Sequence, residues 1–181
     1  FEKGFSPTTV VFDVPTEFAA NNPLCPPVPD FSDDKPQCFH PENFDGQFRG
    51  PVSLREALSQ SINVPSVKVL YLADLRDVVE VAYRFGLTTL TNPDFYGLSL
   101  VLGGGAVRLS DLLSAYSVLA SDGVKRPQTL VLEVRDGSGN ILESYADRGD
   151  RVSDPQFVRL VNDILSDTGG RSKLFQNSLS L

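Results

Sequence analysis

The sequence contains no methionine and no tryptophan, and it has one histidine and two cysteines among its 181 residues. Because the chain has no Met at all and starts with Phe1, we expect it to be a processed or excised segment of a longer protein. Lys and Arg are scarce: 16 of them face 23 Asp and Glu, which gives a net charge of −7. This acidic balance argues against a nucleic-acid partner, because phosphate binding depends on Lys and Arg releasing counterions.

Long apolar runs are also missing. No run approaches the ~18 residues that a membrane-spanning helix needs, so we expect no part of this segment to cross a bilayer. Hydrophobic residues make up 41% of the chain and charged residues 22%, which is the composition of a globular protein. A length in the usual range of ~100–200 residues per domain predicts one domain or a large piece of one.

The two cysteines, Cys25 and Cys38, flank a stretch crowded with proline. A disulfide closing this loop would stabilise the fold by ~3 kcal/mol in an oxidising compartment. Two cysteines alone leave free thiols on a surface insertion as an open alternative. A zinc site is not expected, because the only imidazole nearby is His40 and structural zinc takes four ligands. The sequence indicates no cofactor.

Proline content and periodicity divide the chain into four stretches. Residues 1–50 hold eight of the 13 prolines and should be loop-rich, with a strand over 10–14. Residues 51–122 are expected to be mostly helical. Within residues 128–145, apolar residues alternate with other residues before an Asp-Gly-Ser-Gly turn and resume after it, which predicts a β-hairpin. A helix is expected over 153–167. Helices followed by a hairpin and a further helix predict an α+β architecture.

Local signals predict where the helices begin and end. Ser53 and Glu56 form a capping box at the start of the first helix. Pro65 predicts a break between two helices, because the residue before a proline avoids the helical region. The remaining end signals are two N-cap serines, Ser110 and Ser153, and the glycines Gly86, Gly123 and Gly169-Gly170.

Two short motif matches are rejected as sites. Ser32-Asp33-Asp34-Lys35 matches the S-x-x-K pattern of serine acyltransferases. It lies among prolines, and two acids beside the lysine would keep it charged, whereas a general base must be neutral. Asp167-Thr168-Gly169 has the letters of the aspartic-protease triplet but lacks a second copy, and a helix C-cap is the better interpretation.

Ser61-Ile62-Asn63, between two predicted helices, is the candidate site. In an extended or turn conformation, the hydroxyl and the carboxamide can face one cleft. Asn63 offers a donor and an acceptor to a peptide bond, and Ser61 can pass a proton along hydrogen bonds. Two capping roles, with Ser at a helix end and Asn as the N-cap of the next helix, are the alternative. Spacing alone favours this alternative.

Several stretches together carry a family resemblance: residues 50–70 (GPVSLREALSQSINVPSVKVL), 96–105 (YGLSLVLGGG), 107–112 (VRLSDL), 2–7 (EKGFSP) and 43–46 (NFDG). They resemble the transpeptidase domain of class A penicillin-binding proteins. Residues 164–167, followed by Arg171 and Phe175, look like the stretch before that domain's last motif. The combination is specific, although no single piece is.

The resemblance implies a penicillin-binding-protein transpeptidase or serine β-lactamase-like fold, of which residues 1–181 would be a fragment holding mostly the helical part and a hairpin. It implies a serine-type D-alanyl-D-alanine transpeptidase that cross-links peptidoglycan through an acyl-enzyme. Ser61 would be the catalytic proton relay, and Asn63 would grip the substrate amide in the same cleft. The S-x-x-K nucleophile is expected just before Phe1 and K-T-G just after Leu181.

The implied partners of the whole protein are peptidoglycan stem peptides and β-lactams. The resemblance also implies an extracytoplasmic location, at the periplasm or cell surface, with a membrane anchor outside this segment, and this location favours the Cys25–Cys38 disulfide. The segment alone is expected to be inactive, since covalent catalysis needs the activated hydroxyl. The alternatives are a non-catalytic binding or scaffold relative and a serine β-lactamase or hydrolase relative. A Ser-x-x-Lys just before Phe1 would separate catalysis from the scaffold.

Overall fold

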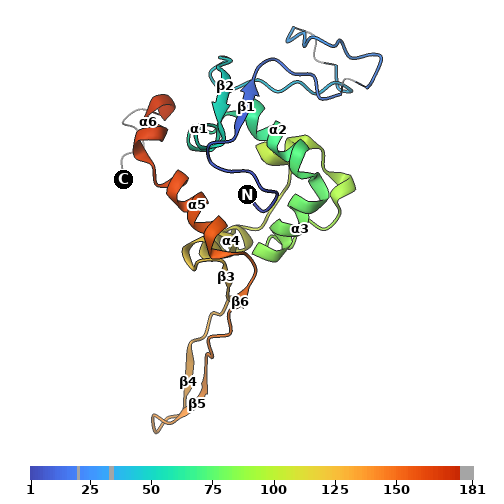
Figure 1. Cartoon of the computed structure of the whole chain (residues 1–181). Helices are drawn as coiled ribbons and strands as arrows, with labels where there is room; N and C mark the ends of the chain where they lie inside the picture. Colours follow the sequence, from blue (N-terminus) through green and yellow to red (C-terminus); the bar gives the residue numbers. More distant parts are fainter. Residues whose placement is uncertain (20, 33–34, 176–181) are drawn as a thin grey trace.

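The computed structural model describes residues 1–19, 21–32 and 35–175, and it shows a helical body from which a long hairpin arm extends (Figure 1). The strands are β1 (Val10–Asp13), β2 (Gly50–Ser53), β3 (Val124–Lys125), β4 (Glu133–Arg135), β5 (Ile141–Ser144) and β6 (Asp150–Arg151). The helices are α1 (Leu54–Ser59), α2 (Asn63–Ala73), α3 (Leu75–Phe85), α4 (Leu109–Ala120), α5 (Pro155–Leu165) and α6 (Thr168–Phe175). Two short 3₁₀ helices, Pro93–Phe95 and Leu98–Leu102, lie between α3 and α4. The architecture is α+β, as the sequence predicts.

A small core lies where β1, β2 and α1 meet. β1 pairs antiparallel with β2, and β2 leads directly into α1. Ser53 and Glu56 form the predicted capping box, with both of its hydrogen bonds present. The buried side chains of this core are Val11, Val52, Leu54, Ala57 and Ile62. The core therefore anchors the start and the middle of α1, through Leu54 and Ala57, and the turn after the helix, through Ile62.

The helix break predicted at Pro65 lies earlier in the chain. α1 ends at Ser59 and α2 begins at Asn63, so Pro65 is the third residue of α2. A proline is tolerated there because the first N–H groups of a helix have no partner within the helix. The break instead falls on Gln60, Ser61 and Ile62.

Two of the predicted N-caps are wrong. α4 begins at Leu109 with Arg108 as its N-cap, and Ser110 lies inside the first turn. α5 is capped by the Asp154 side chain, which accepts the N–H of Gln156, rather than by Ser153. The Ser153 hydroxyl instead donates to the Glu2 carboxylate at 3.4 Å, so a distant partner engages the side chain that the local pattern singled out.

The predicted glycine endings are right at one place and wrong at another. Gly86 ends α3 in the left-handed region, with φ 109°. Gly169 and Gly170 do not end α5, which stops at Leu165, but lie inside α6. The Asp167 carboxylate accepts the N–H of Gly170 at 2.9 Å, so Asp167 marks the start of α6 and is not a C-cap.

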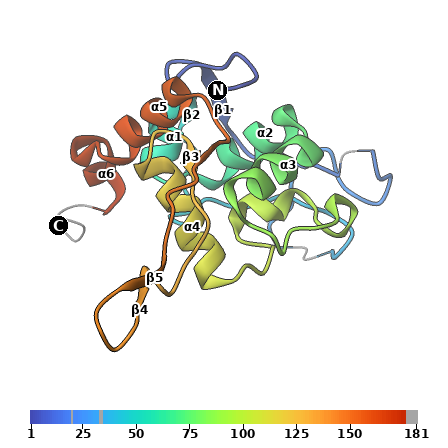
Figure 2. The ribbon, with the colours of Figure 1, turned by 90° about the horizontal axis from the view of Figure 1, so that it is seen from below.

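The predicted hairpin is an arm that projects from the helices in both views (Figure 1, Figure 2). β4 and β5 pair antiparallel with an irregularity between Val134 and Arg135, and all their residues are exposed. β3 and β6 pair at the base of the arm. Among the described residues, none of the helices combines the length and the apolar character that a bilayer-spanning helix requires.

Gly123 closes the junction between α4 and the arm, and we expect its substitution to be costly. Its φ is 86°, and an added Cβ would lie 2.3 Å from the backbone oxygen of Ser153. Gly139 has the same φ of 86° with no heavy atom within 4 Å of that position, so it isolates the cost of the backbone conformation. Gly139→Ala should lower the free energy of unfolding by about 1–2 kcal/mol and Gly123→Ala by about 2–4 kcal/mol. Equal losses in urea unfolding would contradict the clash.

Candidate active site

The turn that ends α1 presents Ser61. The N–H of Ser61 donates to the carbonyl of Leu58 at 3.2 Å, and the N–H of Ile62 donates to the carbonyl of Ala57 at 2.9 Å. These two bonds define a Schellman motif, whose left-handed position is usually a glycine. Here Ser61 occupies that position with φ 54°. A non-glycine residue in this region costs about 1–2 kcal/mol, and such an exception is a reason to look for a function.

Ile62, which lies between the two candidate residues in the sequence, is buried in the core, whereas Ser61 and Asn63 lie nearer the surface. Ile62 is 2% exposed and belongs to the same core as Ala57. An apolar contact between the residues at these two positions is typical of a Schellman motif. Ser61 is exposed and Asn63 is half-buried. The Ser61 hydroxyl makes no hydrogen bond with the described residues. The sequence S-x-N therefore becomes a buried anchor flanked by two polar side chains nearer the surface.

Asn63 is held by a segment distant in the sequence. Its amide nitrogen donates to the carbonyl of Glu42 at 2.8 Å. The α2 N-cap residue, Ile62, offers no side-chain cap, and the N–H of Val64 donates instead to the Asn43 side-chain oxygen at 3.1 Å. The alternative in which Asn63 is the N-cap of α2 is therefore wrong, because Asn63 lies within the helix and a remote asparagine supplies the cap.

Sequence reasoning missed the two residues behind this cap. The Asn43 amide nitrogen donates to both carboxylate oxygens of Asp13, at 2.8 and 3.0 Å, and to the carbonyl of Gln47 at 2.7 Å. Asp13 is 0% exposed and Asn43 is 4% exposed. The signal that could have found them is Asp13 itself, an acidic residue at an inward-facing position of an apolar strand, since a buried carboxylate needs a partner.

The hollows near the site do not reach its two residues. A cavity of about 390 Å³ is lined by Arg49, Pro51, Val52, Glu56, Gln60 and Ile62. A larger one of about 570 Å³ lies among α2, α3 and α5, and Phe1 forms part of its wall. Ser61 and Asn63 line neither. The cleft that these residues were predicted to share stays a prediction.

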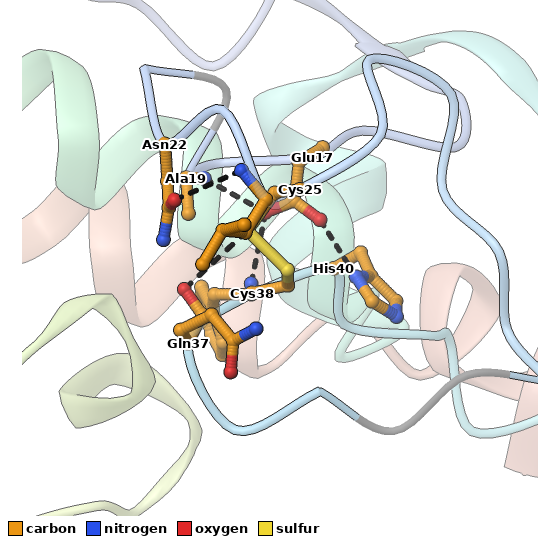
Figure 3. The surroundings of a disulfide bond; sticks show 9 residues. Glu17, Ala19, Asn22, Cys25, Gln37, Cys38 and His40 are labelled. Carbon is orange, nitrogen blue, oxygen red and sulfur yellow. Dashed lines mark hydrogen bonds and ion pairs between the residues drawn. A yellow bond between two sulfur atoms is a disulfide. The ribbon is translucent and has the colours of Figure 1, made fainter.

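A disulfide joins Cys25 and Cys38, whose Cα atoms are 5.5 Å apart (Figure 3). The Glu17 side chain lies beside it and is fully buried. One of its oxygens accepts the N–H groups of Ala19 and Phe39, each at 2.8 Å, and the other lies 2.7 Å from Nδ1 of His40. Burial alone would raise the pKa of Glu17, but the hydrogen bonds from Phe39, Ala19 and His40 outweigh it and hold the pKa below its usual value.

The rejected candidates have structural roles. Ligand atoms of Glu17, Cys25 and Cys38 lie within 4.8 Å of one another, but both sulfurs are in the disulfide and offer no thiolate to a metal. The Ser32 hydroxyl donates to the Asp30 carboxylate at 2.6 Å, which is no arrangement for a nucleophile. Two further members of its S-x-x-K match, Asp33 and Asp34, lie outside the described residues.

We expect Ser61→Gly to stabilise the chain. Glycine adopts the left-handed region without strain, whereas Ser61→Ala keeps both the strain and a Cβ. The glycine variant should therefore be more stable than the alanine variant by about 0.5–1 kcal/mol, after allowance for the greater freedom of glycine in the unfolded chain. Equilibrium unfolding of both variants tests this. A less stable glycine variant would mean that the serine conformation is not strained.

Glu17 should make the fold sensitive to acid. Its pKa is lowered in the folded state, so the stabilisation is complete above the unfolded pKa of about 4.3 and is lost as the pH falls below it. Glu17→Gln should cost about 1–3 kcal/mol at pH 7, because it keeps one acceptor oxygen but loses the charge and the acceptor that faces His40. The substitution should also make the decline of the free energy of unfolding below pH 4.3 less steep. Glu143→Gln, at an exposed position, is the matched control. A Glu17→Gln variant whose free energy of unfolding falls with pH as that of the wild type does would contradict the assignment.

Comparison with known proteins gives homologues over most of the chain. Penicillin-binding protein 2D of Bacillus subtilis (strain 168) is 29% identical over 155 residues, covering 84% of this chain and 20% of the relative. Penicillin-binding protein 1A of Clostridium acetobutylicum is 33% identical over 132 residues, covering 70% of this chain and 16% of the relative. The chain thus spans a fifth or less of the length of these relatives. No family model matches the chain.

Solved structures share the fold. The penicillin-binding protein PonA1 from Mycobacterium tuberculosis superposes with a TM-score of 0.72 at 22% identity, covering 95% of this chain and 44% of that one. Penicillin-binding protein A from the same organism, solved as an imipenem acyl-enzyme complex, gives 0.72 at 18% identity over 99% of this chain and 42% of that one. Penicillin-binding protein 1A from Haemophilus influenzae gives 0.64 at 22% identity over 82% of this chain and 20% of that one.

Proposed function

We propose that this chain, which is a homologue of the penicillin-binding proteins and has the fold of part of their transpeptidase domain, is the interior of a serine-type D-alanyl-D-alanine transpeptidase site. The observation that carries the proposal is the Ser61-Ile62-Asn63 turn. A strained backbone holds an exposed hydroxyl on one side of a buried anchor, and a tethered carboxamide follows on the other. The end of α1 needs only a left-handed residue at this position, which glycine would supply without strain, so the turn by itself does not explain why a serine stands there.

The two side chains have complementary tasks in this proposal. One N–H of the Asn63 amide is held by the Glu42 carbonyl, which orients the group and leaves its second N–H and its oxygen for the amide of a stem peptide or a β-lactam. The Ser61 hydroxyl donates and accepts, so it can relay a proton between the nucleophile's base and the leaving or incoming amine. Neither residue forms the acyl bond.

The nucleophile is proposed to come from residues that precede Phe1 in a longer chain, and K-T-G from residues that follow Leu181. Support comes from the cavity of about 570 Å³ beside Phe1. Its walls carry apolar side chains, among them Val69, Val81, Phe85 and Leu119, so a preceding apolar helix would find a partner there. The reaction is then acyl transfer through a serine ester.

The location proposed for the whole protein is the extracytoplasmic face of the cell membrane, with its anchor outside this segment and peptidoglycan stem peptides as substrates. The Cys25–Cys38 disulfide supports this placement, because disulfides persist in oxidising compartments outside the cytoplasm.

Labelling with a fluorescent penicillin tests the function. The chain of residues 1–181 should not be labelled after denaturing electrophoresis, whereas a longer protein that carries both flanking segments should be. Asn63→Ala in the longer protein should slow acylation about 10²–10³-fold, by analogy with the loss of one oxyanion donor. Asn140→Ala, in the exposed turn of the arm, is the matched control and should acylate at the wild-type rate.

Each other outcome has a definite meaning. Stoichiometric labelling of residues 1–181 alone would show a nucleophile that this proposal lacks. An unlabelled longer protein would favour the non-catalytic scaffold relative, and rapid release of hydrolysed penicillin would favour the β-lactamase relative. Equal acylation rates for wild type and Asn63→Ala would show that Asn63 has no part in substrate binding.

A further inference from the structure

A buried polar pair, Asp13 and Asn43, stands behind the candidate active site. The pair joins β1 to the segment that leads from the disulfide loop toward β2. Both residues are nearly inaccessible, and the Asp13 carboxylate also accepts the backbone N–H of Arg49 at 3.0 Å, with the Arg49 guanidinium 3.6 Å away. A buried carboxylate with these donors is fully engaged, so it holds its partners in one arrangement.

The amide of Asn43 has a single orientation that satisfies its surroundings. Its nitrogen faces only acceptors, which are the two oxygens of Asp13 and the carbonyl of Gln47. Its oxygen faces a donor, the N–H of Val64. Turning the amide over would set oxygen against oxygen on one side and N–H against N–H on the other. Asp13 therefore determines which end of Asn43 meets α2.

Two consecutive residues act on the start of α2. The Glu42 carbonyl holds the Asn63 side chain, and the Asn43 side chain holds the next backbone N–H, that of Val64. Pro65 has no N–H, and Ile62 provides no side-chain cap, so these contacts supply what the first turn of α2 lacks locally. A displacement of residues 42–43 would move the Asn63 amide and loosen its backbone together.

We infer that Asn43, oriented by Asp13, is a positioning residue that sets the direction of the Asn63 amide for the substrate; this inference rests on the proposed function. Asn43 itself touches no substrate. It acts through the first turn of α2 and through the neighbouring Glu42 carbonyl. The upstream end of this segment is anchored as well, because the buried Glu17 carboxylate accepts the N–H of Phe39.

The test is a double-mutant cycle in the longer protein that carries both flanking segments. Asn43→Asp keeps an acceptor for the Val64 N–H but replaces the donor that faces Asp13 with a second carboxylate, so it disturbs the pair while preserving size. We expect acylation by a fluorescent penicillin to slow about 10–100-fold, as displacements of about 1 Å in a positioned group do. In an Asn63→Ala background the same substitution should slow acylation less than threefold, because the group that it positions is gone.

Two further variants separate positioning from general loss of stability. The exchange Asp13→Asn with Asn43→Asp restores one donor and one acceptor to the pair and should recover at least a third of the lost rate. Asn162→Asp, in α5, is the matched control: its amide donates to a backbone carbonyl, that of Leu119, at 2.9 Å, away from the site. It should leave the acylation rate of folded protein at the wild-type value.

The outcomes also separate this inference from the proposed function. Additive effects of Asn43→Asp and Asn63→Ala, or equal slowing by Asn162→Asp, would overturn the inference while labelling itself stands. If the longer wild-type protein is not labelled, the proposed function fails, and hydrogen exchange of the Val64 N–H then decides the structural part. Exchange at least tenfold faster in Asn43→Asp than in Asn162→Asp supports the control of α2 by Asn43, and unchanged exchange overturns it.

Discussion

Burial of Ile62 is the constraint on which the candidate site depends. The side chain enters the core formed by β1, β2 and α1, and the two Schellman hydrogen bonds at the end of α1 can form only when the residue before it turns left-handed. Hydrophobic burial of a large aliphatic side chain contributes about 1.5–3 kcal/mol, which is enough to offset the strain at Ser61. The core thereby holds Ser61, an exposed polar residue, in a left-handed backbone conformation that serine does not favour by itself.

Polar interactions complete what this apolar anchor begins. Buried carboxylates organise two places in the loop-rich first quarter of the chain: Glu17 beside the disulfide, and Asp13 behind α2. Glu17 accepts two backbone N–H groups and faces His40, whereas Asp13 accepts one backbone N–H and faces Asn43 and Arg49. Such partners are the condition under which a buried charge is tolerated. Residues 39–43, which follow the disulfide loop, are therefore held at both ends, and the last two of them reach the start of α2.

Much apolar surface remains uncovered. Leu130, Leu132, Ile141 and Leu142 on the arm are all more than half exposed, as are Leu109, Leu113 and Tyr116 along α4. The described strands form only two-stranded ladders, which rarely stand alone in water. Together with relatives of which the chain covers a fifth or less, these surfaces fit a chain that is part of a larger domain.

The sequence alone determined the features whose hydrogen bonds close within a few residues. The Ser53–Glu56 capping box, the end of α3 at Gly86 and the hairpin were predicted for this reason. Tertiary structure decided the rest. The Ser153 hydroxyl bonds the distant Glu2 carboxylate instead of capping α5, and α2 begins at Asn63, where Asn43, 21 residues before Val64, caps it. Asp13 and Asn43 lie 30 residues apart, and no local pattern shows that two buried polar groups satisfy each other until the fold brings them together.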